Sequence, residues 1–156
     1  MNEQLKELKE DIAVEQKNIE ETIQRLISIK NKFQDTPKDY TTEPAIGTYL
    51  MNFYNGVEHI LKRICKVYYN TFPTGFNWHK ELLDLSYISP KGKIPVFSKE
   101  TVTLLYRYKD FRHRFISGYG FQLKAEKMRH LVDDVEPLWA NIQQELLQFI
   151  SKLSIA

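Results

Sequence analysis

The sequence predicts an all-α fold, an antiparallel helical bundle of four main helices with a short helix in a connecting loop. Long segments repeat their apolar residues at helical spacing, and the prolines and glycines gather mostly between those segments. The one β-like run, residues 94–97, contains Pro95, which lacks the donor that a central strand needs. A chain of 156 residues can bury a core without disulfides, so we expect a single domain over residues 1–156.

The first helix is expected over residues 5–33. Every seventh residue there is apolar: Leu5, Ile12, Ile19, Leu26 and Phe33. No proline or glycine interrupts the segment, and its other faces carry mainly Glu, Lys and Gln. This spacing also suits a coiled-coil seam, but a helix lying along a bundle core is the simpler interpretation. The helix is expected to end at residues 35–37, where a proline follows.

The second helix is expected to start at residue 43. Pro44 suits the first helical turn, and an apolar stripe continues as far as Val67. Gly47 and Gly56 lower the helix propensity of this segment. We expect them to let another backbone approach closely.

Two histidines are expected to have no catalytic role. His59 follows Glu58, and both are expected on a solvated face of the second helix. His79 lies in a predicted short helix, residues 78–83, inside the irregular segment 70–98. Because it stands beside a tryptophan, we expect a hydrogen-bonded packing residue there.

The third helix should begin after Ser98, a favourable N-cap residue, and stop at Gly118. The last helix is expected over residues 124–153, where one face is apolar throughout. Pro137 removes one backbone donor from it and should kink it near residues 133–134.

The composition excludes several classes of protein. The net charge is only +2, so any case for a polyanionic partner depends on a local patch. Cys65 is the one cysteine, which excludes an internal disulfide framework and suits a reducing cytoplasm. The first residues are acidic and polar, unlike a signal peptide, and no apolar run approaches the ~20 residues of a membrane helix.

A basic, aromatic patch is predicted between residues 104 and 130. It holds seven basic residues against two acids: Arg107, Lys109, Arg112, Arg114, Lys124, Lys127 and Arg129 against Asp110 and Glu126. Four aromatic residues in the patch are candidates for stacking on bases: Tyr106, Tyr108, Tyr119 and Phe121. Such a patch suits RNA. The alternative is a solvated basic face whose aromatic residues belong to the core.

The pair Arg112-His113 offers groups that RNA cleavage requires. A base must take the proton of the 2′-hydroxyl, a cation must stabilise the phosphorane, and an acid must protonate the leaving oxygen. Histidine can fill either proton-transfer role, and arginine matches phosphate oxygens. Adjacent helix residues point about 100° apart, so two copies of the helix in a dimer would bring such groups together more easily. No motif for a metal, a cofactor or another catalytic chemistry is present.

Several motifs together resemble the HepT-like branch of the HEPN superfamily. They are the stretch YLMNFYNGVEHILKRI, then W-H-x-E-L-L, then S-x-E-T-x-x-x-L, and finally F-R-H-x-x-x-x-x-Y-G followed by a leucine. The likeness covers most of residues 44–153. It implies an all-helical HEPN-like fold, a prokaryotic ribonuclease toxin acting without cofactor or metal, and a small nucleotidyltransferase as antitoxin partner.

The resemblance also implies site residues. The signature R-x-x-x-x-H-x-Y of the family places its Arg on Arg112 and its Tyr on Tyr119, but its His position falls on Ser117. A serine does not titrate near neutrality, so it cannot replace a histidine base directly. His113 lies one turn before Ser117 on the same helical face, where it either takes over the role or is structural.

The expected function is therefore that of a HepT-like endoribonuclease toxin. The resemblance implies a homodimer with the cleft between two protomers, formed by Arg112, His113, Ser117 and Tyr119. It further implies that the partner nucleotidyltransferase modifies Tyr119 with AMP. The alternatives are a degenerate module that binds this partner or RNA without cleavage, and a helical scaffold unrelated to RNA.

Overall fold

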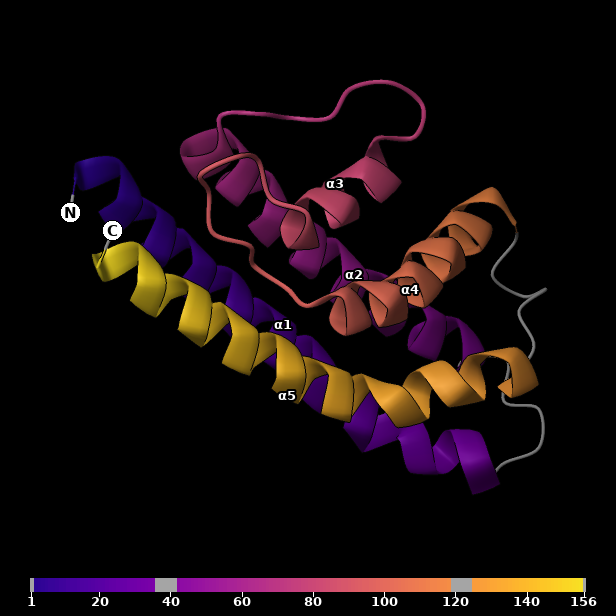
Figure 1. The fold of residues 1–156 in the computed structure, drawn as a ribbon. Helices are drawn as coiled ribbons and strands as arrows, with labels where there is room; N and C mark the ends of the chain where they lie inside the picture. Colours follow the sequence, from indigo (N-terminus) through magenta and orange to yellow (C-terminus); the bar gives the residue numbers. More distant parts are fainter. Residues whose placement is uncertain (1, 36–41, 119–124, 156) are drawn as a thin grey trace.

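The computed structural model of the chain describes residues 2–35, 42–118 and 125–155. Its elements are the helices α1 (Glu3–Asp35), α2 (Thr42–Ile64), α3 (Trp78–Tyr87), α4 (Lys99–Ser117) and α5 (Ala125–Ile155), with a π-helical turn, η1 (Cys65–Tyr69), after α2 (Figure 1). These residues contain no strand, so the predicted all-α fold is confirmed. Within the described ranges, no helix has the length and hydropathy needed to cross a membrane.

The two longest helices, α1 and α5, run side by side in opposite directions along the molecule (Figure 1). The two ends of the chain consequently lie at the same end of the bundle. Helix α2 packs closely along α1, and α4 packs on both α2 and α5. Helix α3 lies outside this arrangement and packs mainly against α4. It therefore brings the irregular region of the sequence beside the basic helix.

The apolar stripes predicted for the helices form one core. Buried members of α1 are Leu8, Ile12, Ile19, Ile23 and Leu26, so this helix lies along a bundle core as expected. At the centre, the Phe53 ring meets the edges of two other rings, at centroid distances of 5.3 Å to Tyr108 and 6.4 Å to Trp139. These contacts join α2, α4 and α5 in the core.

Gly56 of α2 packs closely against Ile19 of α1. A Cβ atom at this position would lie 2.5 Å from Cγ1 of Ile19, closer than real side chains come. Both residues are buried. The prediction named an approaching backbone, whereas the group that fills the space is the Ile19 side chain, which fits there because Gly56 has no Cβ.

The segment that the sequence suggested to be irregular is tied down by hydrogen bonds. The Tyr69 hydroxyl donates to the carbonyl of Ile94 (2.8 Å), and the Tyr68 hydroxyl accepts from the N–H of Ile94 (2.9 Å). The N–H of Val96 donates to the carbonyl of Ser86 (2.8 Å). Helix α3 extends to Tyr87, beyond the predicted end at residue 83, because its last turn takes part in this network.

Helix α4 begins as predicted. The Ser98 side chain accepts a hydrogen bond from the Thr101 N–H (3.2 Å), which caps the helix. Glu145 of α5 accepts from the Ser98 N–H (2.7 Å) and from the Thr101 hydroxyl (2.6 Å), so the start of α4 is fixed to α5. Helix α5 continues through Pro137, and the bend expected there stays a prediction.

Candidate phosphate-binding and catalytic site

A cavity of about 250 Å³ lies between the start of α3 and the second half of α4. It is lined by Phe76, Asn77, His79, Lys80, Lys109, Asp110, Arg112 and His113. Three of these side chains are cationic and one is a carboxylate, so the lining is positive even with neutral histidines. A small cationic hollow of this kind suits an anion such as a phosphate group.

Arg112 is held in place by a neutral partner. Its Nε–H donates to Oδ1 of Asn55 on α2 at 2.6 Å, and the side chain is half-buried. Among the described residues, no carboxylate forms an ion pair with it. The guanidinium is therefore oriented by Asn55 while its charge stays available to an anion.

His113 and Ser117 are both exposed on α4. His113 lines the cavity with Arg112, although the two are neighbours on the helix, while Ser117 is not among the lining residues. Arg112 and His113 were expected to point about 100° apart, yet both side chains line the same cavity. Tyr119, the other expected site residue, lies outside the described residues.

His79 forms a close pair with Glu58 of α2. Its Nδ1 lies 2.6 Å from Oε2 of Glu58, whose side chain is only 3% exposed. The imidazole also stacks on the Trp78 ring at a centroid distance of 3.5 Å. The expectation that Glu58 is solvated is wrong, because α3 covers it. His79 is a hydrogen-bonded packing residue, as expected, but it also lines the cavity.

Tyr54 lies one turn before Glu58 on the same buried face of α2. Burial, and next the negative charge of Glu58, raise the pKa of the Tyr54 phenol far above its usual value. Arg112 acts on the same phenol in the opposite direction. The phenol therefore stays protonated.

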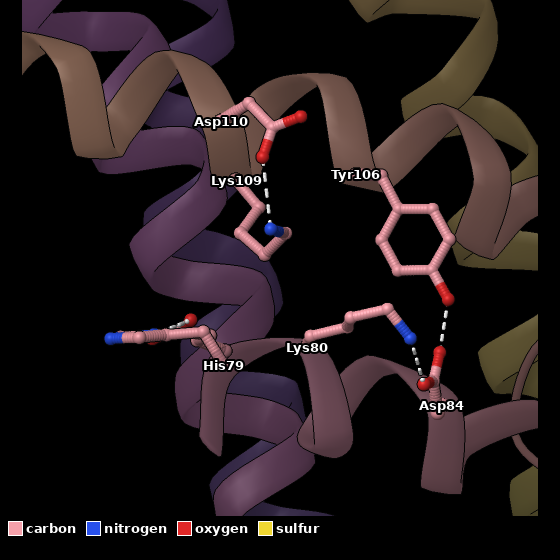
Figure 2. Close-up of polar contacts among 7 residues, drawn as sticks. His79, Lys80, Asp84, Tyr106, Lys109 and Asp110 are labelled. Atoms are coloured by element: carbon pink, nitrogen blue, oxygen red, sulfur yellow. Dashed lines mark hydrogen bonds and ion pairs between the residues drawn. The ribbon is translucent and has the colours of Figure 1, made fainter. Parts of the chain in front are cut away.

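The remaining cations of the cavity have anionic partners. Lys80 pairs with Asp84 at 2.8 Å, and Lys109 pairs with Asp110 at 2.9 Å. Figure 2 shows the Lys80 side chain running along α3 to Asp84, which the hydroxyl of Tyr106 also binds, while the His79 ring extends in the opposite direction and Lys109 on α4 turns to Asp110. The hydrogen bond to Asp84 raises the pKa of Lys80, so this ammonium stays charged.

Several residues of the basic, aromatic patch predicted between residues 104 and 130 are engaged by partners within the protein. Arg107 pairs with Asp134 at 3.2 Å, and Arg114 is exposed. Tyr108 belongs to the core, where its hydroxyl donates to the carbonyl of Leu131 (2.7 Å). Tyr106 is engaged with Asp84. Neither tyrosine is placed for base stacking, whereas Phe76 is fully exposed and lines the cavity.

A larger hollow of about 660 Å³ lies elsewhere, around η1. Its lining is Lys62, Arg63, Cys65, Lys66, Asn70, Thr71 and Phe72. It contains no histidine or carboxylate. Its thiol is buried, which raises the pKa of Cys65 to about 11 and keeps it protonated. This hollow therefore lacks a group for proton transfer near neutral pH.

Comparison with known families decides what kind of protein this is. The model of a family described as HepT-like protein matches residues 45–153, which include every residue lining the cavity between α3 and α4. The chain belongs to the HepT-like protein family. No curated protein and no solved structure matches it.

The HepT-like match does not cover α1, which ends at Asp35. This helix nevertheless contributes part of the core, including Ile19 against Gly56. Within the described residues, no three His, Cys, Asp or Glu side chains come together as metal ligands.

The Glu58–His79 pair is the part of the site that sequence reasoning missed. A signal for it was present, because Glu58 lies on the same helical face as Tyr54 and Leu61, in the middle of an apolar stripe. A carboxylate at such a position needs a partner when it is buried. Which partner it finds depends on how the irregular segment folds back, and helical spacing gives no information on that.

Proposed function

We propose that this HepT-like protein is an endoribonuclease of the toxin type that cleaves RNA without a metal ion. Arg112 holds the scissile phosphate, and His113 lies beside it in the same cavity. The observation that carries the proposal is Arg112 itself: a half-buried guanidinium, oriented by Asn55 and not neutralised by a described carboxylate. Family membership supports the same activity.

The proposal includes the partners that the family resemblance implies. Two protomers, each a single domain, form a cytoplasmic homodimer with the active cleft between them, and Ser117 lines this cleft near Tyr119. A small nucleotidyltransferase binds the protein as its antitoxin and transfers AMP to Tyr119. The exposed end of α4, with Ile116 56% exposed, supports a contact surface next to the site.

Cleavage of tRNA or mRNA in the presence of EDTA tests the activity. We expect fragments that end in a cyclic phosphate. Arg112→Ala should lower the rate about 10²-fold or more, because it removes the charge that stabilises the phosphorane. Arg114→Ala is the matched control, since Arg114 is exposed on the same helix and does not line the cavity. Equal rates for both variants and the unchanged protein would refute the assignment.

A second candidate function is a degenerate module that binds the nucleotidyltransferase or RNA without cleavage. The observation that favours it is Ser117, an exposed serine where the family signature has a histidine. Under this alternative the protein co-purifies with its partner and no RNA fragments appear. We expect Ser117→His to increase cleavage at least about tenfold if the position acts in proton transfer. An unchanged rate would mean that the chain uses another group.

A further inference from the structure

The cavity between α3 and α4 contains a titratable group that the family signature does not assign. His79 reaches this cavity from α3, whereas Arg112 and His113 reach it from α4. All three belong to one protomer. The cavity thus combines two imidazoles with a guanidinium before any second subunit is considered.

The pair of His79 with Glu58 resembles the way in which hydrolases align a histidine base. A buried carboxylate bonded to Nδ1 keeps the proton on that nitrogen and leaves Nε2 to accept another. The stack on Trp78 fixes the ring from a second side. His79 remains about 28% exposed, so the imidazole is oriented and still open to a ligand.

The cations of the cavity can hold a phosphodiester beside this imidazole. Lys80 and Lys109 are anchored by carboxylates, and Arg112 by the neutral oxygen of Asn55. The volume of about 250 Å³ is below the 300 Å³ or more that small-molecule pockets usually have. It therefore suits one phosphate with the edges of its riboses, while the bases remain outside.

Phe76 adds a surface for one of those bases. Its side chain is fully exposed and lines the cavity. The whole ring is therefore accessible to a ligand that enters the cavity. Stacking of a base on an aromatic ring beside a cationic groove is a common feature of single-stranded RNA binding.

We propose that this cavity is the part of the dimer cleft contributed by one protomer and binds the scissile phosphodiester, and that His79, aligned by Glu58, takes the proton of the 2′-hydroxyl. The inference rests on the proposed ribonuclease function and adds to it the base that Ser117 cannot supply. Nε2 of His79 accepts the proton as the 2′-oxygen bonds to phosphorus. The bond from phosphorus to the 5′-oxygen breaks, and protonated His113 gives a proton to that oxygen. The products are a 2′,3′-cyclic phosphate and a 5′-hydroxyl, and exchange of one proton with water restores both histidines.

Binding is tested on the full-length protein by NMR of its histidine side chains. The probe is a 2′-deoxy dinucleotide, which carries the phosphodiester but cannot be cleaved by this route. We expect the ring signals of His79 and His113 to shift, whereas those of His59, which faces Glu15 on another side of α2, stay unchanged. An unchanged His79 signal at saturating probe would overturn the inference, even if the protein cleaves RNA.

The catalytic role is tested with His79→Gln, which keeps a donor for Glu58. The cleavage rate should fall about 10²-fold or more, while His59→Gln leaves it unchanged. Glu58→Gln should also lower the rate and, as a positioning effect, alter the tautomer of His79 seen in its nitrogen shifts. A full rate for His79→Gln would overturn proton transfer by this residue. If the unchanged protein cleaves no RNA but His79 responds to the probe, the ribonuclease function fails and the binding site stands.

Discussion

Glu58 and His59 are consecutive residues of α2, yet they enter two different histidine–carboxylate pairs. Glu58 meets His79 at 2.6 Å and is 3% exposed, whereas His59 meets Glu15 at 3.7 Å and is itself 54% exposed. One residue along the helix changes the direction of a side chain by about 100°. The comparison teaches that the same two chemical groups form an aligned, buried pair on one side of α2 and a loose surface contact on the other.

The two sides also differ in what surrounds the pair. The hollow beside His59, of about 350 Å³, contains Glu15 but no lysine or arginine. The cavity beside His79 contains Lys80, Lys109 and Arg112. Only the second has the charge to hold a phosphate near an imidazole. Helix α2 thus contacts α1 on the side of His59, and it contacts α3 on the side of Glu58, where the candidate site lies.

The largest expected effect is on stability. His79→Ala leaves the Glu58 carboxylate buried without its partner, which should cost about 3 kcal/mol of unfolding free energy. His59→Ala should cost less than about 0.5 kcal/mol, since its pair with Glu15 is long and exposed. Urea unfolding measures both. The double replacement Glu58→Met with His79→Leu should recover much of the loss, because it removes the charge as well. Equal losses for the two histidines would remove the distinction between the pairs.

Gly56→Ala tests the packed side of α2. The new Cβ would force Ile19 aside, at about 1–3 kcal/mol for overpacking, and a gain of about 1 kcal/mol in helix propensity offsets part of it. We expect a net loss of about 0–2 kcal/mol by chemical denaturation. Cleavage by the folded protein should not change, because Gly56 does not line the cavity with Arg112. If Gly56→Ala is more stable than the parent protein, Ile19 of α1 moves aside without a significant cost.

Asn55→Ala tests the contact between α2 and the candidate site, because Asn55 binds Arg112. It removes the acceptor that orients Arg112, and we expect a stability loss of about 1 kcal/mol. The cleavage rate should fall about tenfold, because a misplaced clamp on the phosphate reduces catalysis. Asn52→Ala on the same helix is the control, as Asn52 is exposed. If Asn55→Ala cleaves at the full rate, the hydrogen bond from Asn55 is not needed to orient Arg112.

The fold was largely predictable because helix boundaries follow local signals. Ser98 caps α4 and the apolar stripes are buried as their spacing indicates. The site was only partly predictable. Arg112 and His113 lie side by side in the sequence and could be selected from it, but His79 and Glu58 are 21 residues apart. Their meeting depends on the fold of the connection after η1, which Asn70 opens with a left-handed backbone (φ 55°).

The position of α1 has a practical consequence for anyone producing this protein. The family match starts at residue 45, and a fragment designed from it would discard the whole first helix. The part of the apolar core that α1 covers, including the Gly56 position against which Ile19 packs, would then be exposed to water. Such a fragment should aggregate during expression, and a negative nuclease assay on it would reflect the truncation and not the activity of the chain with α1.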